Sequence, residues 1–189
     1  MTGTFIAIFG PSGSGKGDLI AHMRTNFPDI VFPVSCTTRA PRPGEVDGEV
    51  YHFVSEEEFD SRIAHGDFLE WAAFGGARYG TLKAEILPAL EKGKTLLREL
   101  DAQGIEKIRK LIPGGNLVVI FIDAGSWEDL SARIRARAPI SDEELEKRRL
   151  RFGEEKAYGA SADYVVHNPQ GKLEEAQREL SALMSALAQ

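Results

Sequence analysis

The sequence predicts an α/β domain with a parallel β-sheet that is covered by helices on both faces. Short apolar, β-branched runs alternate along the 189 residues with stretches of helical periodicity. A glycine-rich turn joins the first of these runs to the first helical stretch. The length is that of one domain, and no apolar run approaches membrane-spanning length, so no membrane association is expected.

The charge and cysteine content narrow the class of protein. With 23 basic and 29 acidic residues the formal net charge is −6, which argues against a nucleic-acid partner and favours a small anionic ligand for any basic cluster. The single cysteine, Cys36, allows no intramolecular disulfide and fits a reducing compartment. No basic leader precedes the first apolar run, so a cytoplasmic location is expected.

The glycine-rich turn has the spacing of a phosphate-binding loop. The run 4–9 predicts a buried strand, and Leu19, Ile20 and Met23 recur at helical spacing after the turn. In such a loop, backbone N–H groups and the helix N-terminus bind phosphate, and the lysine reaches the β- and γ-phosphates. A solvated surface turn is the alternative, which both flanks oppose. The loop predicts a P-loop NTPase core, with nucleotide contacts from Gly10, Pro11, Ser12, Gly13, Ser14, Gly15 and Lys16.

The end of this loop departs from the usual pattern. Gly17 stands where a Ser or Thr hydroxyl normally binds magnesium, and Asp18 follows it. The loop is still expected to hold phosphate, and Gly17 and Asp18 are included in the predicted ATP contacts.

The first half of the chain predicts a small mixed β lobe at 35–81, inserted after a second strand at 30–34. Two prolines and a glycine keep residues 35–44 extended. Strands are predicted at 50–54 and 68–72, with a helix between them that starts in a capping box at Ser55 and ends at Gly66. Gly75-Gly76 predicts a turn, and Thr81 is expected to cap a helix that runs to Gly93.

The second half returns to the strand and helix alternation. Strands are predicted at 95–101, 117–123 and 164–168, with a crossover helix on Ile105, Ile108 and Ile112. A charged helical lid is expected at 126–158, with a break at Pro139 and a second capping box at Ser141 to Glu144. A closing amphipathic helix is expected at 170–188. The predicted core therefore comprises 1–34, 82–125 and 159–189.

A second anion site is predicted in the lobe. Arg39 and Arg42 lie on the proline-stiffened loop, and Tyr51 and Tyr79 could donate hydroxyl groups. Forked guanidinium donors match the oxygens of a phosphate monoester. A single arginine is usually a solvated surface charge, but two on one stiff loop favour a ligand.

These residues resemble the guanylate kinase family over nearly the whole chain. The most specific stretches are Ser35-Cys36-Thr37-Thr38-Arg39-Ala40-Pro41-Arg42-Pro43-Gly44-Glu45, Gly48-Glu49-Val50-Tyr51, Phe68-Leu69-Glu70-Trp71 and Tyr79-Gly80-Thr81. The resemblance implies a magnesium-dependent transfer of the ATP γ-phosphate to GMP, giving ADP and GDP. It also implies that the lobe binds GMP, with dGMP as a further candidate acceptor, and that the protein is a monomer or a homodimer.

The resemblance implies roles for individual positions. Arg39, Arg42, Tyr51 and Tyr79 would hold the GMP phosphate, and Ser35, Glu70, Thr81 and Asp101 would read its guanine. Carboxylates only accept hydrogen bonds, so Glu70 and Asp101 suit the N1–H and N2 amino donors of guanine and disfavour AMP. The ATP site would add Arg133 beside the adenine and Asn168 at its amino group. The implied catalytic set is Lys16, Arg42, Arg137 and Arg148.

The magnesium ligands are the open part of this prediction. Glu99 stands where the family usually has Asp, and its neighbour Arg98 is unusual in a central strand because a buried guanidinium requires a partner. Either Asp18 or Glu99 is expected to hold magnesium, directly or through water, because a hard cation favours carboxylate oxygen.

Two other functions stay open at this stage. The altered metal end of the loop favours a guanylate-kinase-like binding module that keeps GMP recognition without efficient catalysis, whereas Lys16 and the lid arginines oppose it. A related small-molecule kinase, such as a ribose-bisphosphate kinase, has a similar loop, but Glu70, Thr81 and Asp101 favour guanine.

Overall fold

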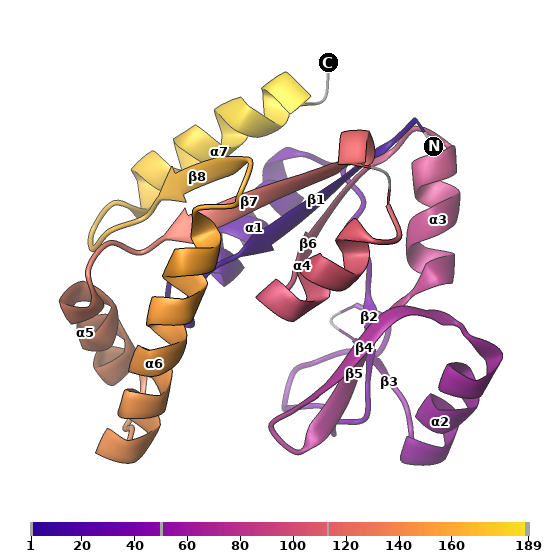
Figure 1. The fold of residues 1–189 in the computed structure, drawn as a ribbon, viewed down its shortest axis with the longest axis horizontal. Helices are drawn as coiled ribbons and strands as arrows, with labels where there is room; N and C mark the ends of the chain where they lie inside the picture. The colour runs from indigo at the N-terminus through magenta and orange to yellow at the C-terminus, as the bar shows by residue number, and fades with distance from the viewer. Residues whose placement is uncertain (1, 50, 113, 188–189) are drawn as a thin grey trace. The chain divides into compact units, whose positions relative to one another are not determined.

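The computed structural model describes residues 2–49, 51–112 and 114–187 and confirms the mixed α/β fold (Figure 1). The main sheet has four strands in the order β6-β1-β7-β8, and a second sheet has the order β3-β2-β5-β4. In the main sheet, where β6 lies beside β1, the N–H of Leu100 donates to the Ile8 carbonyl at 3.0 Å. The strands of the main sheet are β1 (Thr4–Phe9), β6 (Thr95–Glu99), β7 (Leu117–Asp123) and β8 (Tyr164–His167).

The chain packs as two compact units. Met1–Phe5, Ile30–Arg98 and Gln103–Leu117 form the first unit, which contains the second sheet. Ile6–Asp29, Glu99–Ala102 and Val118–Gln189 form the second unit, which contains the glycine-rich loop.

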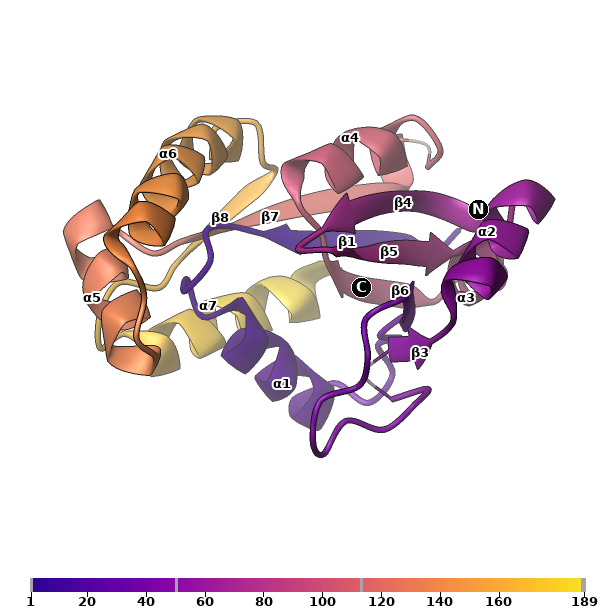
Figure 2. The same cartoon turned by 90° about the horizontal axis from the view of Figure 1, so that it is seen from below.

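The core of the second unit is built on most of β1, on β7 and on β8. Ile6 to Phe9 are at most 1% exposed, as expected for a strand covered on both faces. Helices α1 (Lys16–Asn26) and α7 (Leu173–Leu187) run side by side and pack together, as Figure 2 shows. The ring of Phe9 lies 5.0 Å from that of Phe121 and 5.3 Å from that of Tyr158.

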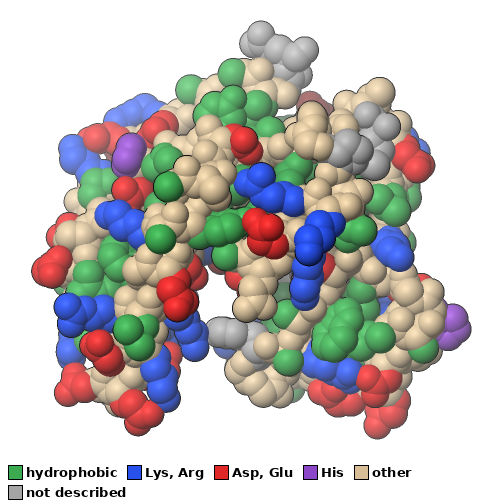
Figure 3. Space-filling model, viewed as in Figure 1, with side chains coloured by type: hydrophobic (Ala, Val, Ile, Leu, Met, Phe, Trp, Pro, Cys, Tyr) green, Lys and Arg blue, Asp and Glu red, His purple; other side chains and the backbone are tan. Residues whose placement is uncertain are grey.

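The lid segment forms two helices, α5 (Trp127–Arg137) and α6 (Asp142–Gly159). The break at Pro139 and the capping box are confirmed, since the Ser141 hydroxyl accepts a hydrogen bond from the Glu144 N–H at 3.2 Å. Ion pairs such as Lys147–Glu143 at 2.7 Å run along α6. Figure 3 shows acidic and basic side chains interspersed over this part of the surface.

The second sheet has two faces of different chemistry. One face carries Cys36, Phe68 and Leu82, which pack with Phe59 from α2 (Glu56–His65). That helix begins as predicted, with the Ser55 hydroxyl accepting from the Glu58 N–H at 3.1 Å. The strands of this sheet are β2 (Ser35–Thr37), β3 (Tyr51–Phe53), β4 (Phe68–Phe74) and β5 (Ala77–Leu82).

A β-bulge in β4 determines which face Glu70 occupies. Phe68 pairs with Leu82, but Glu70 pairs with Thr81, so the register shifts by one residue at Leu69. Because Leu82 and Thr81 are adjacent and point to opposite faces, Phe68 and Glu70 also do. The bulge therefore sends Phe68 into the core and Glu70 to the other face.

Some predicted elements are wrong in detail. Residues 30–34 form no strand: only Val31 makes an isolated bridge, to Leu96, and Pro33 has no N–H to continue the ladder. Thr81 is not a helix cap but lies within β5, a strand that the sequence analysis did not predict. The following helix, α3 (Lys83–Glu91), has Leu82 at its N-cap. The crossover helix is present as α4 (Ala102–Arg109).

Across the described parts of the chain, no helix combines the length and the apolar character needed to cross a bilayer.

Two glycines of α6 provide a test of the packing against β7. A Cβ on Gly159 would lie 2.7 Å from Cδ1 of the Phe121 ring, whereas a Cβ on Gly153 would meet nothing within 4 Å. Gly159→Ala should therefore lower the free energy of unfolding by about 1–3 kcal/mol through overpacking. Gly153→Ala should raise it by about 0.5–1 kcal/mol through helix propensity. Urea denaturation of both variants measures the difference, and equal effects would contradict this account of the α6–β7 contact.

Candidate nucleotide site

The glycine-rich loop lies between β1 and α1, as predicted. Gly10, Gly13 and Gly15 have φ values of 151°, 94° and 88°, in the range that disfavours side chains. A Cβ on Gly10 would lie 2.6 Å from the Ile122 carbonyl oxygen, and a Cβ on Gly15 would lie 2.3 Å from Asn168 Nδ2. The loop therefore needs glycine at both positions for its conformation and for its packing.

Lys16 is the cation of the loop and is only 9% exposed. Its Nζ donates to the Gly10 carbonyl at 2.6 Å and to the Pro11 carbonyl at 3.0 Å. The Glu99 carboxylate lies 3.4 Å from the same nitrogen. The ammonium is thus held at the loop by oxygen atoms, in a position where phosphate oxygens could replace them. The Ser14 hydroxyl nearby is buried and has no hydrogen-bond partner in the part of the chain that the structure describes.

Asn168 and Arg133 are brought together beside the loop. Asn168 is 2% exposed, and its Nδ2 donates to the Ser14 carbonyl at 2.8 Å. Arg133 Nη2 donates to the Asn168 carbonyl at 2.7 Å, and its Nε donates to Gln170 Oε1 at 2.6 Å. Arg133, predicted for the lid, and Asn168, predicted after the last strand, therefore form one cluster beside the glycine-rich loop.

The two other lid arginines differ in their contacts. Arg148 Nη1 donates to the Ser12 hydroxyl at 3.1 Å, and Arg148 Nε pairs with Glu144 at 3.1 Å. Arg137 is the last residue of α5 and is exposed. Arg148 is therefore in contact with the loop, and Arg137 is a charged group on the lid surface.

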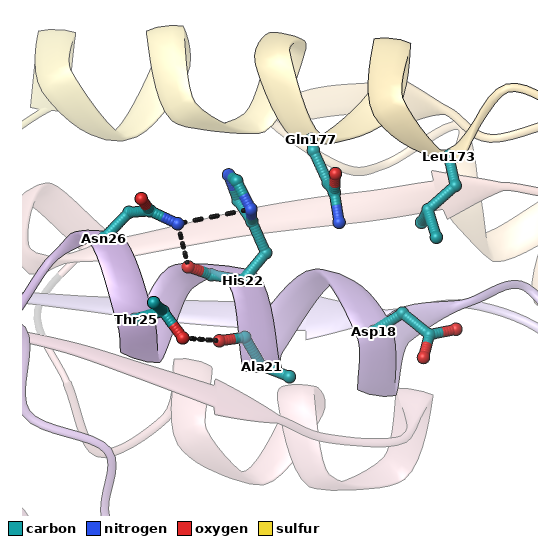
Figure 4. A pocket seen from close by; sticks show the side chains of 7 residues that line it. All are labelled: Asp18, Ala21, His22, Thr25, Asn26, Leu173 and Gln177. Carbon is teal, nitrogen blue, oxygen red and sulfur yellow. Dashed lines mark hydrogen bonds between the residues drawn. The ribbon is translucent and has the colours of Figure 1, made fainter.

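The two carboxylates considered for magnesium lie in different surroundings. Glu99 is half exposed and lies beside Lys16. Asp18 lies on the exposed side of α1, where it lines a shallow groove with His22 and with Leu173 and Gln177 of α7 (Figure 4). A Cβ on Gly17 would meet nothing within 4 Å, so the space left by the absent hydroxyl is open.

The donor set fits a magnesium ion that arrives with its nucleotide. Among the described residues, no group of three or more His, Cys, Asp or Glu side chains could hold a metal alone. Magnesium at phosphate sites is commonly held by one or two carboxylates, water and the substrate phosphates. Glu99 beside Lys16 supplies one such carboxylate.

Glu155 of α6 is a residue of this site that the sequence analysis missed. Burial raises its pKa, Lys16 and Arg151 lower it, and Asp101 raises it. Glu155 follows Arg148 by seven residues, which places both on one face of the helix. The seven-residue spacing from the predicted lid residue Arg148 was the sequence signal from which Glu155 could have been predicted. Asp101, which was predicted to read guanine, lies in the second unit with Glu155 and Lys16.

The predicted guanine-reading residues of the lobe form one row across the second sheet. Ser35 pairs with Tyr51 on one side and with Thr81 on the other, and Thr81 pairs with Glu70. Directly paired residues share a face, so all four side chains lie on the face opposite the apolar core. The Thr81 hydroxyl donates to Glu70 Oε1 at 2.5 Å. The structure therefore brings together four residues that span positions 35–81.

The predicted phosphate-binding arginines are organised by Glu45, which the sequence analysis did not single out as a functional residue. Arg39 Nη2 pairs with Glu45 at 2.9 Å, and the Arg42 N–H donates to Glu45 Oε2 at 2.7 Å. That hydrogen bond from Arg42, with the charge of Arg39, lowers the pKa of Glu45. Burial opposes the charge on Arg39, but Glu45 and Tyr79 outweigh it and raise its pKa. The three-residue spacing of Arg39, Arg42 and Glu45 was the sequence signal from which the role of Glu45 could have been predicted.

Tyrosine rings lie beside Arg39. Its guanidinium carbon lies 5.4 Å from the ring centroid of Tyr51, whose own centroid lies 5.8 Å from that of Tyr79. Arg39 is thus held by a carboxylate and by aromatic rings. Arg42 is more exposed.

Comparison with known proteins gives a consistent result. The family model described as "Guanylate kinase" matches residues 2–187. A guanylate kinase of Streptomyces kasugaensis is 42% identical over 175 residues, which cover 93% of this chain and 83% of that protein. One of Parasynechococcus marenigrum is 40% identical over 182 residues, which cover 96% and 98%. The crystal structure of guanylate kinase from Anaplasma phagocytophilum matches with a TM-score of 0.72 at 26% identity, covering 98% of this chain and 86% of that one.

The raised pKa of Glu155 predicts a pH-dependent stability. The folded protein binds the proton of the Glu155 carboxyl group more tightly than the unfolded chain does. Above the folded pKa, the ionised carboxylate therefore lowers the free energy of unfolding. Glu155→Gln should therefore raise the melting temperature at pH 8. The gain should disappear by about pH 4, where the carboxyl group is protonated in both states.

The exposed residue Glu146 on the same helix provides the control. Glu146→Gln should change the melting temperature little at either pH. A Glu155→Gln variant that is less stable than the wild type at pH 8 would show that the carboxylate is stabilised, not strained, at this position.

Proposed function

Because the chain belongs to the guanylate kinase family, we propose that its two groups of functional side chains act on different nucleotides, ATP in the second unit and GMP in the first. The chain is an ATP:GMP phosphotransferase, which converts ATP and GMP to ADP and GDP. The resemblance predicted from its motifs is confirmed, and the binding-module and ribose-bisphosphate kinase alternatives are not favoured.

The observation that carries the proposal for GMP is the row of side chains across the second sheet. Glu70 is an acceptor-only group that would take the N1–H and N2 amino donors of guanine. Thr81 fixes its orientation through the 2.5 Å hydrogen bond, and Ser35 supplies a hydroxyl in the next register position. AMP offers no donors to the acceptor sites of Glu70 that Thr81 leaves open, so discrimination against adenine follows from a partly unsatisfied carboxylate.

The phosphate of GMP is assigned to Arg39, Arg42, Tyr51 and Tyr79. Glu45 holds the guanidinium of Arg39 and the backbone of Arg42, so the Arg39 guanidinium and the loop at Arg42 are positioned before the phosphate binds. Preorganised donors cost no rearrangement during binding. Asp101 would complete guanine recognition, as the family resemblance predicts.

The ATP site is assigned to the glycine-rich loop and the lid. Phosphate oxygens would take the place of the Gly10 and Pro11 carbonyls on Lys16, and Arg148 at Ser12 would add a second cation. Arg133 and Asn168 would contact the adenine, and Arg137 would approach the phosphates from the lid. Phosphoryl transfer depends mainly on alignment and charge neutralisation, and these cations supply both.

The transfer itself moves one phosphoryl group between two phosphates. An oxygen of the GMP phosphate forms a bond to the γ-phosphorus as the bond to the ADP oxygen breaks. Negative charge spreads over the equatorial oxygens, where Lys16, Arg42, Arg137 and Arg148 would stabilise it. Exclusion of water by the lid would prevent hydrolysis of ATP.

Magnesium is assigned to ATP, with Glu99 as the protein carboxylate nearest to it. When bound, the ion would neutralise charge on the β- and γ-phosphates. Glu99 already lies at the lysine of the loop, and Asp18 remains the alternative predicted from the sequence.

A cytoplasmic location is proposed, in keeping with the free, buried Cys36.

The test of the GMP assignment is a coupled assay of ADP release with GMP, dGMP, AMP, UMP and ribose bisphosphate as acceptors. GMP should exceed AMP by about 100-fold or more in kcat/KM, because AMP offers Glu70 neither of the two donors that guanine supplies. Lys16→Met should lower kcat by about 100-fold or more. Lys147→Met, at an exposed position of α6, is the control and should retain wild-type activity. Tight GMP binding without turnover would instead indicate a binding module.

The metal assignment is tested by paired carboxylate variants. Glu99→Gln should raise the magnesium concentration for half-maximal activity by about tenfold, the range expected for loss of a ligand-orienting carboxylate. Asp18→Asn should leave it unchanged, because Asp18 lines the α1–α7 groove. The opposite pattern, with only Asp18→Asn shifting the magnesium requirement, would transfer the role to Asp18.

A further inference from the structure

Arg98, in β6, is a partly buried cation of the first unit that has no role in the assignments above. It belongs to the same unit as Ser35, Glu70 and Thr81. Its Nη2 donates a hydrogen bond to the Ser35 hydroxyl. Its Nε and Nη1 atoms are buried and have no hydrogen-bond partner among the described residues. Two donor nitrogens of a strongly polar group are therefore available at this place.

Unsatisfied buried donors are costly, and a guanidinium cannot avoid the cost by losing its proton. Burial lowers the pKa of Arg98, while the negative charge of Glu70 is the first of several influences that raise it; Tyr51, Glu85 and Cys36 follow. The guanidinium thus lies in the electrostatic field of the Glu70 carboxylate. Such an arrangement suits a bound group that accepts hydrogen bonds.

The register of the second sheet locates Arg98 relative to the guanine-reading row. Its partner, Ser35, lies between Tyr51 and Thr81 in that row, and Thr81 lies between Ser35 and Glu70. The Glu70 carboxylate, an acceptor, therefore lies on the same face of the second sheet as the Ser35 hydroxyl, to which the guanidinium of Arg98 donates.

Guanine presents the complementary pattern. Along one edge it has the acceptor O6 next to the donors N1–H and the N2 amino group, and N7 is a second acceptor beside O6. Glu70 accounts only for the donor half. The acceptor half needs a donor, and arginine is the side chain that most often meets O6 and N7 of guanine.

We propose that Arg98 is a specificity-determining residue that donates to O6 of guanine through the nitrogen atoms left without partners, while Nη2 holds Ser35. This inference rests on the proposed binding of GMP to the first unit. Adenine carries an amino donor in place of O6, so donor would meet donor at Arg98, in addition to the loss of the base donors at Glu70. Selection of guanine then has two independent parts.

The experiment compares GMP with 6-thio-GMP, whose sulfur is a weak acceptor, and with IMP, which keeps O6 but lacks the N2 amino group. In the wild type, replacing O6 by sulfur should lower kcat/KM by about tenfold or more. Arg98→Leu should lower kcat/KM for GMP by about 10- to 100-fold, mainly through KM. It should also reduce the ratio of GMP to 6-thio-GMP to near one, yet leave the ratio of GMP to IMP unchanged.

Two further variants separate contact with the base from support of Ser35. Ser35→Ala removes the hydroxyl that Arg98 holds but keeps the guanidinium, so it should lower the ratio of GMP to 6-thio-GMP less than Arg98→Leu does. Arg98→Lys keeps a donor and should restore part of the preference for O6. The inference is overturned if Arg98→Leu keeps the wild-type ratio, or if Ser35→Ala lowers it as far as Arg98→Leu does.

The assay also separates this inference from the proposed function. Turnover of GMP by the wild type with an unchanged ratio in Arg98→Leu overturns only the role of Arg98. Absence of wild-type turnover and of GMP binding by calorimetry overturns the assignment of GMP itself. If Arg98→Leu does not fold, as judged by circular dichroism, Arg98→Lys and Arg98→Gln carry the same comparison. The affinity for ATP should not change in any of the Arg98 variants.

Discussion

Close backbone packing around the phosphate loop is the constraint on which the nucleotide site depends. The loop reaches the end of β7 at Gly10 and the amide of Asn168 at Gly15, at distances that leave no room for a Cβ. Asn168 in turn holds the Ser14 carbonyl and, through its own carbonyl, Arg133. The positions of Lys16, Asn168 and Arg133 therefore follow from two contacts that only glycine permits.

Several cations of the two proposed nucleotide sites lie beside carboxylates. Lys16 faces Glu99 and lies in the field of Glu155, while Arg39 faces Glu45. Arg98 differs from these two cations, because it donates to the Ser35 hydroxyl. A cation whose hydrogen-bond partner is a hydroxyl keeps donors that a ligand can satisfy.

Local signals allowed the phosphate loop, the capped lid helices and the core strands to be predicted, because glycine spacing, capping boxes and apolar runs act over a few residues. The predictions of a strand at 30–34 and of a helix cap at Thr81 were wrong. Apolar runs also occur outside strands, and a threonine that precedes a helix is not always its cap. The pairing of Ser35 with Thr81, and the contacts of Glu45 and Glu155, depend on segments far apart or on helix faces. Tertiary structure determines such contacts, and single-residue propensities do not report them.

The β-bulge at Leu69 has a consequence for how guanine selectivity can change during evolution. A point substitution at Glu70 alters the chemistry of one position, and loss of Leu69 would remove the bulge but leave Phe68 and Glu70 on their present faces. Loss of one residue between Glu70 and the turn at Gly75 would instead move Glu70 from its pairing with Thr81 to a pairing with Gly80, and so turn the carboxylate toward the apolar face. Base preference in this lobe is thus encoded partly by chain length, so insertions and deletions in β4 are a route to relatives with other acceptors.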